Sequence, residues 1–160
     1  MNLLSLEEFE ASIEAYTYPD EFGVCDGSAA IADGVHAGQQ PRVSFCLSYR
    51  TELGNDHDPE AGYKLHIIYG ALAAPSERGY ESINDSPEAM TFSWDLTTTP
   101  VTVTGHKATA HIELNSVEVE ASKPGAMAAV EALLYGDDTE EPTVQMPDQI
   151  VAAIEAVTAT

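Results

Sequence analysis

Five histidines are the residues best suited to acid–base or metal chemistry, and none of them stands in a motif that would use it. They are His36, His57, His66, His106 and His111. The chain contains no HExxH spacing, and no histidine stands beside a serine or cysteine nucleophile motif. His66 and His111 fall within predicted strands, where we expect them to be wall residues. The sequence therefore predicts no catalytic residue and no enzyme activity.

No other motif supplies the missing chemistry. The chain has no GxGxxG fingerprint, no phosphate-binding P-loop and no basic–aromatic stripe. Paired carboxylates are so numerous in this acidic chain that glycosidase-like spacing carries no information. The tyrosines and the tryptophan fall on predicted strand faces, where core packing is the expected use. We predict that no cofactor is bound and that the role is structural or binding.

The segment 55–60 is the one cluster that resembles a metal site. Its sequence, Asn-Asp-His-Asp-Pro-Glu, gathers oxygen donors and an imidazole, and a hard cation such as calcium favours oxygen ligands. It lacks the glycine and the terminal bidentate glutamate of an EF-hand loop. Acidic turn residues are common in solvated hairpin tips. We therefore predict a hairpin tip here and no metal site.

The charge of the chain is unusual. Six lysines and arginines stand against 27 aspartates and glutamates, which gives a formal net charge of −21 at pH 7. Such a surface repels nucleic acids and anionic membranes, although the same composition also serves solubility alone.

Cys25 and Cys46 allow one disulfide, but no cysteine pattern indicates it.

We expect neither a membrane span nor a secretory signal in this sequence. No apolar run reaches the length that crosses a bilayer, and the N-terminus lacks a basic region. We expect synthesis and retention in a cytoplasm, or export only within an assembly.

Two long strands, 62–70 and 89–97, form the central unit of the predicted fold. Turn-rich polar segments join them, and the first strand is bounded by glycines. In the second strand, alternation places four apolar side chains on one face. These are Met90, Phe92, Trp94 and Leu96.

Three further strands are predicted from period-two alternation, at 7–18, 42–51 and 107–117. For 7–18 a helix is the rival interpretation, because glutamate and alanine favour helix. The ending Tyr16-Thr17-Tyr18 favours the strand. The residues 25–41 are expected to be a loop with at most a short strand or helical turn.

Helical spacing predicts one flanking α-helix that begins at Pro124 and is ended by Gly136. Its recurring apolar residues are Met127, Val130, Leu133 and Leu134. A single domain, 1–160, is expected, with 1–6 as a lead-in and 137–160 as an acidic link and short helix, the helix at about 148–157. The predicted fold class is mainly β (α+β), an antiparallel β-sandwich or open barrel with one flanking α-helix.

The residues 62–101 carry a specific resemblance to a known family. The strings INDSPEA and FSWDLTTTPV within them are its most specific part, and the similarity extends over nearly the whole chain. Further matching strings are TYPDEF (17–22), CDGS (25–28), GQQPR (38–42), YRTELGND (49–56), ALLYGDD (132–138) and Pro147-Asp148. In these residues the chain resembles the tail tube (major tail) proteins of long, flexible-tailed bacteriophages and their prophages.

The resemblance implies a structural virion protein that is made in a bacterial cytoplasm and located in the phage tail. Members of that family form rings, usually of six subunits, whose inner strands join into a continuous barrel. The rings stack into the tube through which the genome passes. The implied partners are copies of the same chain and other tail proteins such as the tape measure. DNA is expected to pass without specific binding, and no membrane partner is implied.

One departure from the family concerns its first strands. Members usually carry further residues ahead of the position that matches Met1, whereas this sequence enters its first predicted strand almost at once. An exposed edge strand would remain. On that basis we expect a monomer or a non-native dimer and poor tube formation.

A second function fits the composition equally well. A free-standing acidic β-domain of this charge would bind a basic protein partner, as an inhibitor or a nucleic-acid mimic. Charge alone does not separate the two functions.

Overall fold

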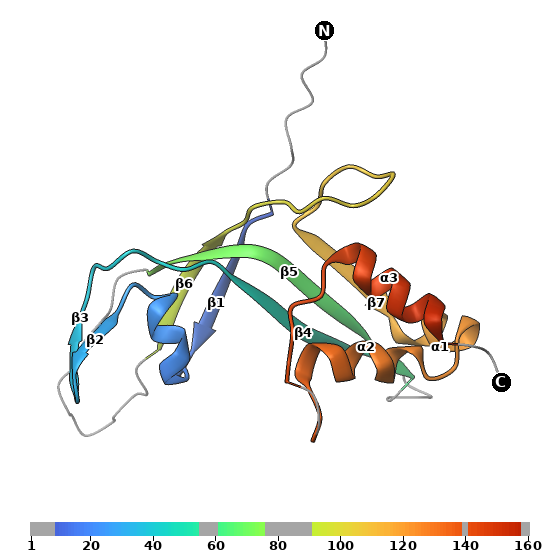
Figure 1. Cartoon of the computed structure of the whole chain (residues 1–160), viewed down its shortest axis with the longest axis horizontal. Coiled ribbons are helices and arrows are strands. Elements are labelled where there is room, and N and C mark those ends of the chain that lie inside the picture. Colours follow the sequence, from blue (N-terminus) through green and yellow to red (C-terminus); the bar gives the residue numbers. More distant parts are fainter. Residues whose placement is uncertain (1–8, 55–60, 76–90, 139–140, 158–160) are drawn as a thin grey trace, which may run out of the picture. The chain divides into compact units, whose positions relative to one another are not determined.

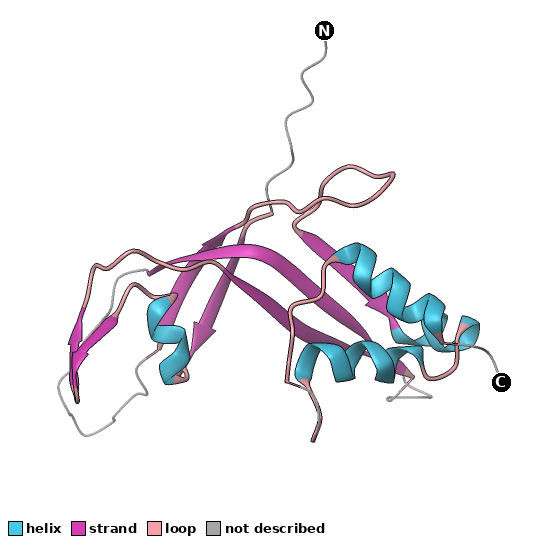
Figure 2. Ribbon diagram, in the orientation of Figure 1, coloured by secondary structure: helices cyan, strands magenta, loops and turns pink. Residues whose placement is uncertain are grey.

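A computed structural model describes residues 9–54, 61–75, 91–138 and 141–157, which are mainly antiparallel β-sheet with three α-helices (Figure 1, Figure 2). The predicted α+β class is thus confirmed, and the described strands form no closed barrel. The elements in chain order are β1 (Ala11–Ala15), the 3₁₀ helix η1 (Asp20–Val24), β2 (Ala29–Ala32), β3 (Val35–Ala37), β4 (Phe45–Leu53), β5 (Gly62–Pro75), β6 (Phe92–Thr97), β7 (His111–Asn115), α1 (Ser116–Ser122), α2 (Ala126–Tyr135) and α3 (Pro147–Ala156).

The described residues fall into two compact units, and each is considered by itself. The first unit, which we call the helical unit, contains β4 from Cys46 onward, the first part of β5 up to Tyr69, β7 and the three α-helices. The second, the aromatic unit, contains β1, η1, β2, β3, the second part of β5 from Gly70, and β6.

The core of the helical unit lies between its sheet and helices α2 and α3. Strand β5 pairs antiparallel with β7, so that Leu65 lies opposite Leu114 and Ile67 opposite Ile112. Alternation places one set of β5 side chains on the helix-facing side. The buried cluster on that side consists of Leu65, Ile67, Tyr69, Leu114, Met127, Val130 and Ile150. Burial of these apolar side chains is the main stabilising contribution in this unit.

Helices α2 and α3 occur where the sequence predicts helices. The N–H of Gly136 bonds to Ala132 O at 2.9 Å and ends α2, while Pro147 occupies the first turn of α3. Glu120 caps the start of α2, because its carboxylate accepts hydrogen bonds from the N–H groups of Gly125 and Met127 at 2.7 and 2.9 Å. These bonds hold the pKa of Glu120 below its usual value.

The sequence predicts one flanking helix and a strand at 107–117. Both predictions are wrong at the end of that strand, where an additional helix, α1, begins. Strand β7 ends at Asn115, whose side chain accepts a hydrogen bond from the N–H of Val117 at 3.1 Å. This is the bond by which an N-cap begins a helix. Helix α1 therefore starts at Ser116, although Val117 and Val119 favour strand by propensity.

The aromatic unit is built on the antiparallel pairing of β6 with β1 and with the second part of β5. Ile13 lies opposite Trp94, and Leu72 opposite Thr97. Strand β1 is shorter than the predicted 7–18, but its alternation is as predicted, with Ile13 half-buried and Ser12 exposed. The strand interpretation of this segment is confirmed over the rival helix.

Trp94 is the centre of the aromatic unit. It is 2% exposed, and its indole N–H donates to Asp26 Oδ1 at 2.7 Å. Its ring meets Tyr18 and Phe22 edge to face at centroid distances of 5.3 and 5.2 Å. Helix η1, where the sequence predicts a turn, carries Phe22 into this cluster.

A small hairpin, β2–β3, occupies part of the predicted loop 25–41. Its turn contains Asp33-Gly34, and Gly34 has a positive φ of 73°. An Asp-Gly pair between short strands is a strong hairpin signal. The loop prediction allowed one short strand and underestimated this local signal.

A three-residue clamp ties α2 to the sheet of the helical unit. Glu131 on α2 accepts a hydrogen bond from the Tyr63 hydroxyl at 2.5 Å and forms an ion pair with Arg50 at 2.7 Å. The Arg50 guanidinium lies 4.6 Å from the centroid of the Tyr63 ring. Burial, followed by the bond to Glu131 and its charge, raises the pKa of Tyr63 to about 12.

We expect Tyr63→Phe to lower the free energy of unfolding at pH 8 by about 1 kcal/mol, because one hydrogen bond is lost while Glu131 keeps Arg50. The difference should shrink as the pH rises from 10 to 12. In that window the unfolded tyrosine ionises while the folded one holds its proton, so wild-type stability falls with pH. Urea unfolding at pH 8 and 11 measures both effects, with Tyr16→Phe, at an exposed position, as the control. If the wild type and Tyr63→Phe differed in free energy of unfolding by the same amount at pH 8 and pH 11, the raised pKa of Tyr63 would be contradicted.

Candidate functional site

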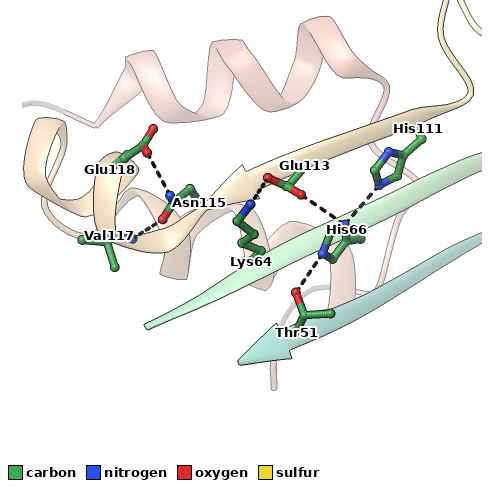
Figure 3. A network of polar contacts seen from close by, with 8 residues as sticks. All are labelled: Thr51, Lys64, His66, His111, Glu113, Asn115, Val117 and Glu118. Carbon is green, nitrogen blue, oxygen red and sulfur yellow. Dashed lines mark hydrogen bonds and ion pairs between the residues drawn. The ribbon is translucent and has the colours of Figure 1, made fainter. Parts of the chain in front are cut away.

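The most organised polar cluster lies on the sheet of the helical unit, on the side opposite the buried cluster (Figure 3). Strand β4 contributes Thr51, β5 contributes Lys64 and His66, and β7 contributes His111 and Glu113. The register places His66 opposite Glu113 and Ile68 opposite His111. The two histidines are therefore diagonal cross-strand neighbours, which is close enough for ring contact.

The rings of His66 and His111 form one in-plane hydrogen bond. His66 Nδ1 and His111 Nε2 are 3.1 Å apart, the ring centroids are 5.3 Å apart, and the planes differ by 10°. The distance between the ring centroids exceeds the distance between the two nitrogens by nearly two imidazole radii. Both nitrogens therefore lie on the line that joins the two ring centroids. The rings are thus edge to edge in a common plane, which is the geometry of an N–H···N bond.

The hydrogen bond continues to Thr51 on the other side of His66. The Thr51 hydroxyl lies 2.9 Å from His66 Nε2. Tyr49 stacks on the His66 ring at a centroid distance of 4.7 Å with planes 10° apart. His66 is 8% exposed, so both of its ring nitrogens are engaged in a largely buried position.

Two charged residues flank the histidine pair. Glu113 Oε2 lies 3.8 Å from His66 Nδ1, and Glu113 Oε1 accepts from Lys64 at 2.7 Å. The bond to Lys64 holds the pKa of Glu113 below its usual value. Burial, and then the neighbouring His66, lowers the pKa of His111. The lowered pKa of Glu113 keeps its carboxylate charged beside the histidine pair, and the lowered pKa of His111 opposes protonation of that ring.

The arrangement Thr51–His66–Glu113 has the order of hydroxyl, base and acid that nucleophilic catalysis uses. A hydrolytic site also needs a substrate pocket and oxyanion donors. Two pockets of the helical unit, the groove described below and a smaller one of about 140 Å³ beside Cys46, are lined by neither Thr51 nor His66. The cluster has the geometry of a proton relay, and these pockets give it no substrate.

The histidine pair does not have the geometry of a chelate. The two facing nitrogens point at each other along one line, so their lone pairs do not converge on a common third point. Among residues 9–54, 61–75, 91–138 and 141–157, no group of three or more histidine, cysteine or acidic side chains has metal-binding geometry. The segment 55–60, considered for calcium from the sequence, lies outside the described residues.

A groove of about 490 Å³ runs beside β7 in the helical unit. Helices α1 and α3 line it together with β7, and Lys64, Glu113 and Glu118 add charged groups. Its apolar lining consists of Val103, Ile112, Leu114, Val119, Pro147, Ile150, Val151 and Ile154. Val151 is 53% exposed, so the aliphatic lining extends to the surface.

The outer side of β7 borders this groove. Tyr69 N donates to Ala110 O at 2.8 Å, and this bond sets the phase of the β5–β7 ladder. By antiparallel alternation, Ile112 and Leu114 direct their backbone groups to β5, while Glu113 directs its own to the outer side. Among the described strands, β7 pairs only with β5. The outer side of β7 is therefore an edge of the sheet that the described strands form.

The remaining histidines and the cysteines occupy separate positions. His36 lies on β3 and His106 in a turn, and both are exposed, whereas His57 lies outside the described residues. Strand positions for His66 and His111 are as predicted. No local sequence pattern predicts their pairing, because the pairing depends on cross-strand register. Both cysteines are free thiols whose pKa is raised by burial.

None of the described helices combines the length and apolar character that a bilayer crossing needs. Comparison of the chain with family models, with curated proteins and with solved structures returned no match.

Proposed function

We propose that this chain is a structural subunit of a phage tail tube, a β-sandwich of the tail-tube type that associates with copies of itself through sheet edges and catalyses no reaction. The residues 62–101 and the matching strings around them support the family. The observation that carries the proposal is the outer edge of β7 beside an aliphatic groove. An edge strand with adjacent apolar surface is suited to β-augmentation by another chain.

The charge supports a passage for DNA. Basic side chains along a channel would bind phosphate by releasing counterions, whereas acidic side chains repel it. With a net charge of −21, part of the acidic excess would line the lumen and let DNA slide without specific binding. Like-charged subunits also repel one another, so their contacts must come from backbone pairing and apolar burial.

The same charge supports the second candidate, an acidic domain that binds a basic protein one to one. The two functions differ in their dependence on salt. Association of like-charged copies is opposed by Coulomb repulsion, so it strengthens when salt screens the charges. Binding of an oppositely charged partner weakens under the same change.

We expect light scattering at high protein concentration to show self-association, at least to a dimer, that is stronger at 0.5 M than at 0.05 M sodium chloride, on the order of tenfold in the dissociation constant. Negative-stain microscopy of the same samples tests for rings or tubes. A chain that stays monomeric at both salt concentrations and captures a basic protein only at low salt would contradict the tube proposal and favour the second candidate.

A groove variant tests the surface that we assign to self-association. Val151→Lys places a charge on the groove while lowering the net negative charge, so lost association would not result from added repulsion. Val35→Lys, on β3 and 49% exposed, makes the same charge change away from the groove. We expect the first variant to weaken self-association at least about tenfold, the effect of roughly 1.4 kcal/mol, and the second to leave it unchanged.

A further inference from the structure

The proposed function does not use the His66–His111 pair, whose hydrogen bond depends on how many protons the two rings carry. Its two facing nitrogens, 3.1 Å apart on one line, have room for one hydrogen between them. We propose that this pair is a proton switch in the helical unit: it links β5 to β7 when the two rings share a single proton at their contact, and it breaks when both rings are protonated.

The surrounding groups assign the proton in the neutral pair. Glu113 Oε2 lies 3.8 Å from His66 Nδ1, and a carboxylate at this distance favours a proton on that nitrogen. His66 Nδ1 then donates to His111 Nε2. The other ring nitrogen, His66 Nε2, accepts from the Thr51 hydroxyl. In this assignment every contact of the relay has one donor and one acceptor.

One added proton preserves the relay. A proton on His66 Nε2 turns that nitrogen into a donor, and the Thr51 hydroxyl can rotate to accept it. His66 then donates at both nitrogens, and the bond to His111 becomes charge-assisted. Two of the charged groups beside the pair, Lys64 on β5 and Glu113 on β7, neutralise each other at 2.7 Å. Tyr49 on β4 stacks on the His66 ring.

A second added proton breaks the relay. His111 Nε2 would then carry a hydrogen that points at the His66 Nδ1 hydrogen, and two positive rings would lie in contact. His111 resists this step, because burial and the neighbouring ring lower its pKa. Protonation of His111 therefore depends on the charge of the neighbouring ring. The result of the second step is lost attachment of β7 at the position where Thr109 also bonds the His111 backbone.

The sign of the stability effect follows from the lowered pKa of His111. The unfolded histidine takes up a proton as the pH falls through its usual value of about 6.5, while the folded one does not. The unfolded state then binds more protons, so the helical unit loses stability as the pH falls below that value. The loss continues until the folded histidine is protonated as well, and the relay opens there.

The test is long-range proton–nitrogen NMR of the imidazoles in the full chain from pH 8 to pH 4.5. At pH 8 we expect a proton on His66 Nδ1 and none on His111 Nε2. On acidification we expect two coupled protonation steps for this pair, and the signals of the exposed His36 serve as an internal reference. Independent titration of His66 and His111, or a bare His66 Nδ1 at pH 8, would overturn the proposal.

A variant pair gives a second readout. We expect the melting temperature of the wild type to fall between pH 7 and pH 5, and His111→Gln to remove about half or more of that fall, because no second ring can be protonated. His36→Gln, at an exposed position on β3, should keep the wild-type dependence. Identical pH profiles for His111→Gln and the wild type would overturn the proposal. The wild-type NMR result decides if the variant does not fold.

Discussion

Trp94→Ala is expected to lower the free energy of unfolding by about 3–5 kcal/mol, which is a large share of the total stability of a domain of this size. The indole is 2% exposed, so its removal leaves a cavity among Tyr18, Phe22 and Phe92. The Asp26 carboxylate also loses the indole N–H that donates to it at 2.7 Å. The two losses have the same sign because both remove stabilising contacts of the folded state.

Two further variants separate the cavity from the hydrogen bond. Trp94→Phe keeps an aromatic ring and removes the indole N–H, so we expect a cost of about 1–3 kcal/mol. Tyr16→Ala removes a large aromatic side chain that is 73% exposed, and we expect a change within about 0.5 kcal/mol. Urea unfolding followed by circular dichroism measures all three, because the chain has a single tryptophan. A Trp94→Ala cost below that of Trp94→Phe would contradict the assignment of Trp94 to the core.

The periodic parts of the fold could be predicted from the sequence. Alternation in 89–97 correctly placed Trp94 and Leu96 on the buried face, and helical spacing correctly located α2 and α3. Which face of a strand or helix is buried follows from the spacing of apolar residues within that segment, so the local sequence predicts it. The same pattern did not record where β7 ends, because a single side-chain bond from Asn115 redirects the chain into α1.

The polar site could be predicted only in part. Strand positions for His66 and His111 follow from local sequence, but their hydrogen bond depends on a register in which His66 lies opposite Glu113. Register between segments 45 residues apart is set by the whole sheet and not by either strand. Thr51 enters from a third strand, which local patterns cannot align with the other two.

Gly70 shows the same limit in the backbone. The sequence places the end of a strand at this glycine, whereas β5 continues through it to Pro75. Gly70 has a positive φ of 57°, and its carbonyl accepts a hydrogen bond from Thr99 N at 3.1 Å. A glycine inside a strand marks a bend or a close approach of another backbone. Here another backbone, that of Thr99, approaches the glycine.

Gly70→Ala is therefore expected to destabilise the aromatic unit by at least about 3 kcal/mol. The new Cβ would lie 2.7 Å from Thr99 O and 3.1 Å from Thr99 Cβ, and a backbone oxygen cannot move aside as a flexible side chain does. Gly34→Ala is the matched control: φ is 73°, and nothing lies within 4 Å of the added Cβ. It incurs the left-handed strain alone, about 1 kcal/mol.

Gly70→Asn distinguishes strain from the steric clash. Asparagine tolerates the left-handed region better than alanine does, but it carries the same Cβ. If the contact with Thr99 dominates, Gly70→Asn will cost nearly as much as Gly70→Ala. Urea unfolding followed by Trp94 fluorescence reports on all three variants, because Trp94 lies in the same unit. Equal costs for Gly70→Ala and Gly34→Ala would show that Thr99 does not approach this position closely enough to exclude a Cβ.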